Sequence, residues 1–268
     1  MSQKATFEFE GKKIEFSVLK GSEKELAIDI GQLRTSTQGV TTIDPGFKNT
    51  GSCQSAITFL DGEHGILRYR GYDIEELAER ANFLEVAYLL IFGDLPTRDQ
   101  LQNFLNDIKQ YSIVADDMKK ILDGFPQSAH PMGILSSLTS ALIAFNPTSV
   151  DVESEEEMYQ AIVKIMGKFP VLTAWSFRKI AGLPLDYGDN KLDYIDNFLK
   201  MLLQMPNQSK YESNPIVKSA IVKLLILHAD HEQNCSTSTV RLVGSSHAGL
   251  YASISAGISA LWGPLHGG

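Results

Sequence analysis

Cysteine is nearly absent from this sequence of 268 residues, in which it occurs only as Cys53 and Cys235. Two cysteines so far apart form neither a disulfide framework nor a Cys-x-x-Cys pair, which excludes a disulfide-rich secreted domain and a thiolate metal site. The N-terminal stretch MSQKATFEFEGKK also lacks the apolar core of a signal peptide. These absences favour a protein of the reducing cytoplasm.

Positive charge is scarce and long apolar runs are missing. The sequence contains 24 Lys and Arg against 32 Asp and Glu, a net charge of −8, and no window is densely basic. Because binding to a phosphate backbone needs net or clustered positive charge, nucleic acid is excluded as the main partner. The longest stretch without charged residues, roughly 242–265, is rich in Ser, Gly and Ala. That composition is too polar for a membrane span.

What the sequence does contain is enough apolar surface for a packed core, with 43% hydrophobic residues. Its first part alternates apolar and polar residues around turn residues, a pattern typical of β-hairpins. One predicted hairpin covers residues 7–18 with a turn at Gly11-Lys12, and a second covers 56–70. The connector between them, residues 35–52, is rich in Gly, Thr and Ser. We therefore expect a β-rich segment with its connector over residues 1–71.

From residue 72 onward the apolar period is that of helices, which predicts a helical domain over 72–268 and a fold that is mainly α. Asp73 with Glu76, and Asn82 with Glu85, have the spacing of capping boxes. The last predicted helix carries small residues in two adjacent rows, which predicts close packing against its neighbours. The predicted helices cover residues 83–92, 98–111, 116–122, 132–145, 155–166, 171–181, 192–205 and 248–261, with one more beginning at Asn214-Pro215.

The region most suggestive of chemistry is the end of the sequence, where the two stretches 227–241 and 262–268 hold three of the six histidines. His228 and His231 end the helical pattern that begins at Asn214-Pro215, and on one helix they would lie about 60° apart, facing one cavity. His266 precedes Gly267-Gly268, where missing Cβ atoms would let a ligand approach the backbone. Clustered imidazoles suit the polarisation of a carbonyl or the binding of a carboxylate near neutral pH.

Each of these histidines also has a simpler interpretation. His228 and His231 could be core residues whose ring nitrogens are satisfied by backbone carbonyls, and His266 could be an ordinary loop residue. A zinc hydrolase built on His228 and His231 is a further alternative. However, their spacing relative to Glu232 differs from His-Glu-x-x-His, and no third ligand follows at a suitable distance, so we expect no metal. From these residues alone the alternatives stay open.

Taken together, these motifs resemble those of the citrate synthases, in particular the allosterically regulated bacterial branch. The resemblance is carried by LHADHEQN-x-STSTVR at residues 227–241 and by WGP-x-HGG at 262–268. Asp44-Pro45-Gly46-Phe47 and His130-Pro131-Met132 also stand where that branch has them, so the resemblance covers essentially the whole sequence. It implies the multi-helix large domain of a citrate synthase behind a short β-rich segment, with the small domain absent from this chain.

Citrate synthases condense oxaloacetate with acetyl-CoA and hydrolyse citryl-CoA to citrate and CoA, the first step of the tricarboxylic acid cycle, and they need no cofactor. The resemblance implies that His266 is the catalytic donor to the acetyl-CoA carbonyl, acting as a neutral imidazole. His231 would bind an oxaloacetate carboxylate, supported by His228 and Asn234. A second catalytic histidine, a catalytic aspartate and the substrate-binding arginines would lie beyond Gly268. The resemblance thus implies an N-terminal portion that is inactive alone.

The regulated relatives bind NADH at a site that includes an Arg-His-Thr triplet and a lysine. Here the triplet position reads Gln110-Tyr111-Ser112, whereas Lys168 is retained. The loss of a guanidinium and an imidazole removes donors that pair with phosphate. We therefore expect NADH to bind poorly at this possible allosteric nucleotide site.

The resemblance also implies self-association, as a dimer that in this branch assembles into a hexamer. The nearest alternative is a 2-methylcitrate synthase, which uses propionyl-CoA on the same scaffold and differs by one methylene of substrate. The long β-rich lead favours the citrate branch. A zinc hydrolase and a non-catalytic helical scaffold are the remaining alternatives.

Overall fold

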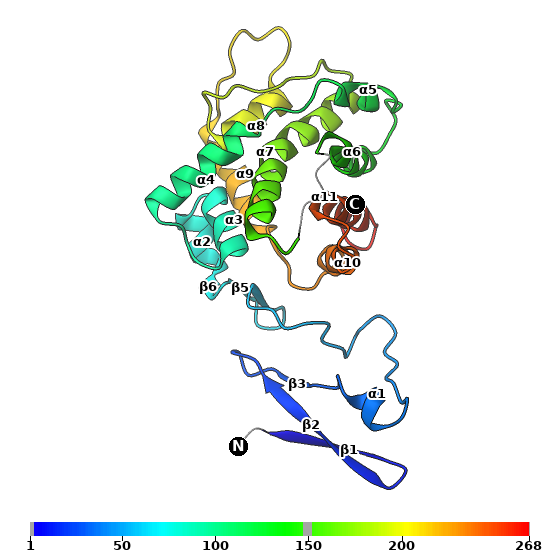
Figure 1. Ribbon diagram of the computed structural model, residues 1–268. Coiled ribbons are helices and arrows are strands. Elements are labelled where there is room, and N and C mark those ends of the chain that lie inside the picture. Colours follow the sequence, from blue (N-terminus) through cyan, green and yellow to red (C-terminus); the bar gives the residue numbers. More distant parts are fainter. Residues whose placement is uncertain (1–2, 147–151, 268) are drawn as a thin grey trace. The chain divides into compact units, whose positions relative to one another are not determined.

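The computed structural model of the protein describes residues 3–146 and 152–267 (Figure 1). The chain divides into two compact units, Met1–Ser55 and Ala56–Gly268. The described part is mainly helical with short sheets toward the N-terminus, as the hydrophobic periodicities predict. None of its helices combines the length and the apolar character that crossing a membrane requires.

The first unit is built on an antiparallel sheet of three strands in the order β1 (Lys4–Phe9), β2 (Lys12–Lys20) and β3 (Leu26–Ile28). Phe9 pairs with Lys12, so Glu10 and Gly11 form a two-residue turn, and their φ angles are 50° and 75°. Positive φ at both positions is the geometry that matches the twist of a tight hairpin. This confirms the first predicted hairpin, with its turn one residue earlier than the predicted Gly11-Lys12. A short helix, α1 (Leu33–Ser36), follows the sheet.

The second unit begins with the other predicted hairpin, which the structure also confirms. Strands β4 (Thr58–Asp61) and β5 (Ile66–Tyr69) pair antiparallel, and β6 (Tyr72–Asp73) pairs with β5. The predicted capping box at Asp73 is wrong, because its carboxylate accepts a hydrogen bond from Nε of Arg68 at 2.8 Å instead of capping the next helix. The box at Asn82 and Glu85 is formed, with both reciprocal hydrogen bonds present.

Helices make up the rest of the second unit, and most lie within a few residues of their predicted positions. Three depart from prediction: the seventh helix is longer, the helix before the histidines ends earlier, and the helix at Cys235–Gly244 is not among those predicted. The helices are α2 (Ile74–Arg80), α3 (Phe83–Phe92), α4 (Arg98–Gln110), α5 (Met118–Asp123), α6 (Pro131–Phe145), α7 (Glu155–Ile180), α8 (Tyr194–Leu203), α9 (Pro215–Leu227), α10 (Cys235–Gly244) and α11 (Leu250–Leu261).

Helix α7 is one helix of 26 residues, where the sequence predicts two helices separated before Pro170. Pro170 has no N–H, so the carbonyl of Met166 lacks the hydrogen bond that an uninterrupted helix would supply. The hydroxyl of Tyr194 donates to that carbonyl at 2.9 Å. A side chain from α8 thus satisfies the group that the proline leaves open, and the helix continues through it.

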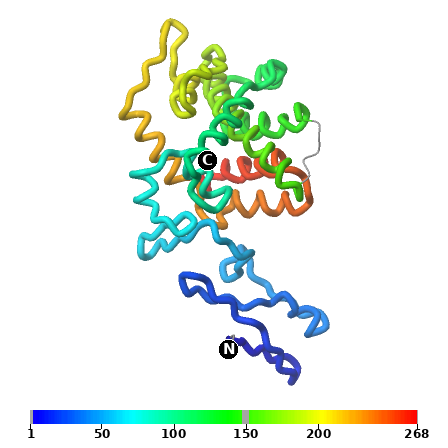
Figure 2. Tube along the Cα trace, turned by 60° about the vertical axis from the view of Figure 1, so that its left-hand side comes forward, coloured from blue at the N-terminus to red at the C-terminus, as the bar shows by residue number. Residues whose placement is uncertain are grey.

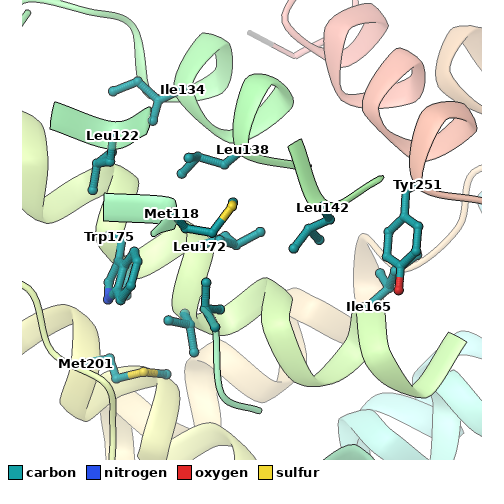
Figure 3. Close-up of a cluster of buried hydrophobic side chains, with 13 residues drawn as sticks. Met118, Leu122, Ile134, Leu138, Leu142, Ile165, Leu172, Trp175, Met201 and Tyr251 are labelled. Atoms are coloured by element: carbon teal, nitrogen blue, oxygen red, sulfur yellow. The ribbon is translucent and has the colours of Figure 1, made fainter. Parts of the chain in front are cut away.

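The main core lies where α5, α6, α7 and α8 meet α11 (Figure 3). Leu138 from α6 and Leu172 and Trp175 from α7 are fully buried there. Helix α11 packs against both α10 and α6, and Figures 1 and 2 show α10 and α11 side by side. A Cβ on Gly257 would lie 2.6 Å from Cγ2 of Val240, so glycine is required for this approach. The predicted close packing of the last helix is therefore confirmed.

Candidate active site

The segment at residues 228–234, here called the histidine loop, joins α9 to α10 and is not helical. The expectation that His228 and His231 share one helix is wrong, because α9 ends at Leu227. In a continued helix the N–H of Asp230 would donate to the carbonyl of Ile226. Here that N–H donates to the hydroxyl of Tyr69 at 3.2 Å, and this hydroxyl lies 3.1 Å from the Ile226 carbonyl oxygen. The helical pattern already tightens at Ala229, whose N–H donates to Ile226, and the Tyr69 hydroxyl of β5 then binds the Asp230 N–H in place of a helical carbonyl.

The two histidines of the loop are both exposed but differ in their contacts. His228 caps the end of α9, with its Nδ1 2.7 Å from the carbonyl oxygen of Leu224. A carbonyl can only accept, so Nδ1 carries a proton and Nε2 is the nitrogen left for a ligand. The ring of His231 has no hydrogen bond to any residue that the structure describes. His231 therefore keeps both ring nitrogens for a ligand.

Asn234 ends the histidine loop and begins α10. Its side-chain oxygen accepts a hydrogen bond from the N–H of Thr237 at 2.9 Å, the usual arrangement of an N-cap. The preceding residue, Gln233, accepts a hydrogen bond at its Oε1 from the Arg241 guanidinium at 2.9 Å. Arg241 lies one helical turn beyond Thr237. These bonds fix the direction in which α10 leaves the loop. Asn234 therefore has a structural role whatever it contributes to binding.

His266 lies against this same helix terminus. Its Nε2 accepts a hydrogen bond from the backbone N–H of Ser236 at 3.1 Å and lies 2.8 Å from the Ser236 hydroxyl. The same hydroxyl oxygen lies 2.9 Å from the carbonyl oxygen of Gly257, so two acceptors share its single proton. Because a backbone N–H can only donate, Nε2 must carry the lone pair, and a neutral ring then has its proton on Nδ1. The contact thus selects the tautomer that offers Nδ1–H to a ligand.

The turn that carries His266 is fixed at its beginning. Trp262, the C-cap residue of α11, stacks on the ring of His130 with ring centroids 5.2 Å apart. The N–H groups of His266 and Gly267 both donate to the carbonyl of Gly263, at 2.9 and 3.2 Å. Gly267 has φ of +153°, which favours glycine. Gly268, the last of the predicted glycines, lies outside the described residues.

The structure therefore brings Asn234 and His266 together at the N-terminus of α10, where the backbone carries a partial positive charge that suits an anion. The convergence of the His228 and His231 rings on this point stays a prediction. Sequence reasoning gave no role to Tyr69, which binds the backbone after α9, or to Ser236, which orients the His266 ring. Ser236 lies within the motif at residues 227–241, but the role of each residue depends on a contact distant in the chain.

Among the described residues there is no group of three or more His, Cys, Asp or Glu arranged to hold an ion. His228 and His231 are thus not joined there by a third protein ligand. The zinc alternative would need its remaining ligands from elsewhere.

The predicted nucleotide site has its donors occupied by the protein itself. Nζ of Lys168 donates to the carbonyls of Tyr111 and Ile113 at 2.9 and 2.8 Å, and burial lowers the pKa of this lysine. The Tyr111 hydroxyl donates to Gln160 at 3.0 Å, and the Ser112 hydroxyl donates to the carbonyl of Lys109 at 2.8 Å. A cavity of about 210 Å³ lies beside Ser112, mainly between α4, α7 and α8. Gln110 is exposed.

Comparison with known proteins gives consistent results at the level of sequence. The family model for the citrate synthase C-terminal domain matches residues 46–268. The chain is 46% identical over 264 residues to citrate synthase 1 of Mycobacterium tuberculosis, covering 98% of this chain and 61% of the relative. It is 45% identical over 267 residues to the citrate synthase of Corynebacterium glutamicum, covering 100% of this chain and 61% of the relative. The chain thus spans about three fifths of the length of these relatives.

Solved structures agree in fold. The citrate synthase of Pyrobaculum aerophilum is similar with a TM-score of 0.73 at 31% identity, over 94% of this chain and 58% of that one. The citrate synthase of Thermotoga maritima has a TM-score of 0.71 at 28% identity, over 84% of this chain and 57% of that one. A third is the citrate synthase of Thermoplasma acidophilum in a ternary complex with carboxymethyl coenzyme A and oxaloacetate. Its TM-score is 0.76 at 24% identity, over 85% of this chain and 58% of that one.

The family match extends over most of the chain and includes every residue of the histidine loop and of the turn around His266. It also includes the helices that position them, from α2 to α11. The chain belongs to the citrate synthase family.

Proposed function

We propose that this chain provides the acetyl-CoA-polarising group and part of the oxaloacetate pocket of a citrate synthase. The observation that carries the proposal is the hydrogen bond from the Ser236 N–H to Nε2 of His266. It leaves Nδ1–H as the donor of a neutral ring, which is the group that the enolisation of a thioester needs. Oxaloacetate and acetyl-CoA are the substrates that family membership favours.

The reaction proceeds by loss of a proton from the acetyl-CoA methyl group. A positioned carboxylate takes this proton while Nδ1–H of His266 donates a hydrogen bond to the thioester carbonyl oxygen, on which negative charge develops. The resulting enol carbon attacks the ketone carbon of oxaloacetate, and as the new C–C bond forms the ketone C=O π bond opens and its oxygen takes up a proton to become a hydroxyl. Water then cleaves the thioester of citryl-CoA, giving citrate and CoA. His231 holds a carboxylate of oxaloacetate, and His228 and Asn234 support it.

The first test is substitution of His266 in the complete polypeptide that carries this sequence. We expect His266→Ala to lower kcat by about 10²–10³-fold, as loss of an oxyanion donor does. The matched control is Ser236→Ala, which removes the hydroxyl but keeps the N–H and should cost less than about tenfold. Near-normal turnover of the His266→Ala enzyme would refute the proposal. Nitrogen chemical shifts of the ring provide a direct check of Nδ1 protonation.

The remaining catalytic groups are proposed to lie outside residues 1–268, so this chain alone should show no oxaloacetate-dependent release of CoA. Its release by the purified 268-residue chain would contradict the partial site. Relative turnover of acetyl-CoA and propionyl-CoA by the complete enzyme distinguishes citrate from 2-methylcitrate synthesis, because the two substrates differ by one methylene. We propose a preference for acetyl-CoA and no requirement for a metal or other cofactor.

NADH regulation is proposed to be weak or absent. The support is that Lys168, Tyr111 and Ser112 direct their donors to groups of the protein itself. The position of the Arg-His-Thr triplet also offers no guanidinium for a phosphate. Equilibrium titration of the complete protein with NADH tests this, and binding in the micromolar range would overturn it.

Self-association is proposed in the form of a dimer and, by likeness to the regulated branch, a hexamer in the cytoplasm. Several apolar side chains of α9, α10 and the turn after α11 are exposed: Ile216, Leu242 and Leu265 at 80%, 74% and 102%. Surfaces of this kind favour association. Sedimentation of the complete protein would measure the assembly.

A further inference from the structure

The residues before and after His231 form hydrogen bonds that fix the backbone, whereas the His231 ring forms none with the described residues. On one side, the Asp230 N–H donates to the hydroxyl of Tyr69 at 3.2 Å. On the other, the N–H of Glu232 donates to Oδ2 of Asp230 at 3.0 Å. The His231 ring itself is exposed and unbonded within the described part of the chain. A ligand-binding residue needs a backbone held by rigid elements, and the unbonded ring nitrogens of His231 remain available to a ligand.

Glu232 holds the conformation that makes this possible. Its φ is +55°, in the left-handed region that residues other than glycine rarely adopt. Such a conformation persists only where surrounding contacts determine it, and it is concentrated at functional sites. The contact in this case is a hydrogen bond from the N–H of Leu60 to Oε1 of Glu232 at 3.0 Å.

The hydrogen bond joins the histidine loop to the hairpin at the start of the unit. Leu60 lies on β4, an edge strand whose other side pairs with β5, so its N–H is available for a partner outside the sheet. Tyr69 lies on β5, directly across from Thr58. Two adjacent strands therefore hold the loop at two points, one on each side of His231.

We propose that Glu232 is a positioning residue for oxaloacetate binding, which holds the backbone of His231 in place through its bond to Leu60. The inference rests on the proposed function, because it takes a carboxylate of oxaloacetate as the group that His231 binds. Tyr69 performs the same task from the other side. The hairpin β4–β5 is then part of the binding apparatus through the Leu60 N–H and the Tyr69 hydroxyl.

The test compares Glu232→Gly with Glu232→Gln in the complete polypeptide. Glycine accepts the left-handed backbone without strain but removes the acceptor, whereas glutamine keeps an acceptor oxygen at the same reach. We expect Glu232→Gly to weaken oxaloacetate binding in calorimetry by about tenfold, which corresponds to about 1.4 kcal/mol. Glutamine should restore most of the affinity. The KM for acetyl-CoA at saturating oxaloacetate should stay within about twofold for both.

A second variant, Tyr69→Phe, keeps the ring and removes only the hydroxyl that holds Asp230, and it should also weaken oxaloacetate binding. Melting temperatures of the variants show that the comparison is made on folded protein. Unchanged affinity in Glu232→Gly, or equal loss in the glycine and glutamine variants, would overturn the positioning role. Failure of the unsubstituted complete protein to bind oxaloacetate would instead overturn the proposed function, and this role with it.

Discussion

Tyr251, at the start of α11, places a hydroxyl in the main core without a partner among the described residues. The side chain is only 5% exposed, and a polar group buried without a hydrogen bond costs about 1–3 kcal/mol of stability. We expect Tyr251→Phe to raise the free energy of unfolding by about 1 kcal/mol, since the ring is kept and only the unpaired hydroxyl is removed. Urea denaturation at pH 7 measures this, and a loss of stability would mean that the hydroxyl does find a partner.

The same residue predicts how stability changes in alkaline solution. Burial raises the pKa of Tyr251 to about 12 from an ordinary 10.0. Because the folded state favours the neutral phenol, ionisation at high pH favours the unfolded state. The free energy of unfolding is therefore fully retained below about pH 10 and falls as the pH rises toward 12. The unsubstituted protein should therefore lose more stability over this range than Tyr251→Phe does. Denaturant titrations of both proteins at pH 9 and pH 11 measure this. An equal change in the free energy of unfolding between the two pH values would contradict the prediction.

Individual residues differ in how far sequence alone determines their role. Asn82 and Glu85 form the predicted capping box because every group it needs lies within one turn of chain. Asp73 has the same spacing but pairs with Arg68 across β5 and β6, a competitor that exists only once the strands pair. His266 follows from its motif, whereas the amide of Ser236 that orients its ring lies 30 residues earlier. Local contacts were predictable and contacts distant in the chain were not.

At the scale of an element, α7 offers the sharpest test. The Tyr194 hydroxyl satisfies the Met166 carbonyl that Pro170 leaves without a helical partner. Tyr194→Phe should destabilise the protein by about 1 kcal/mol, because that carbonyl then loses its hydrogen bond. In a Pro170→Ala background the new N–H can bond to Met166, so the same substitution should cost much less. A double-mutant cycle in urea measures the coupling, and additive effects would show that the two residues act independently.

Helix ends show the same division between local and distant causes. The residues predict a break near Pro170 and continuity through His228, and both predictions are wrong for the same reason. In each case a tyrosine hydroxyl from another element binds the backbone. Tyr194 donates to the Met166 carbonyl, and Tyr69 accepts from the Asp230 N–H in place of a helical carbonyl. Apolar periodicity is similar in both cases, so it cannot reveal either event. The hairpins and most other helices depend on neighbouring residues and were predicted correctly.

At the scale of the whole chain, the two compact units predict how a protease acts. The connector within Met1–Ser55 exposes Ile43 and Phe47 by 92% and 73%, while both tryptophans and the main core belong to Ala56–Gly268. Exposed irregular backbone is a preferred region for proteolytic nicking, and thermolysin cleaves beside large apolar side chains. We expect early cleavage at these two residues, followed by a stable product that contains the helical unit.

The helical unit should keep its properties after that cleavage, because the described side chains of its main core come mainly from α5 to α8 and α11, within the unit itself. Mass spectrometry identifies the cut, and circular dichroism compares the unfolding midpoint of the product with that of the intact chain. The control Phe47→Ser combined with Ile43→Ser should slow the first cut without changing the midpoint. Cleavage that starts within the helices, or a helical signal lost as fast as the connector is cut, would show that the second unit depends on the first for its stability.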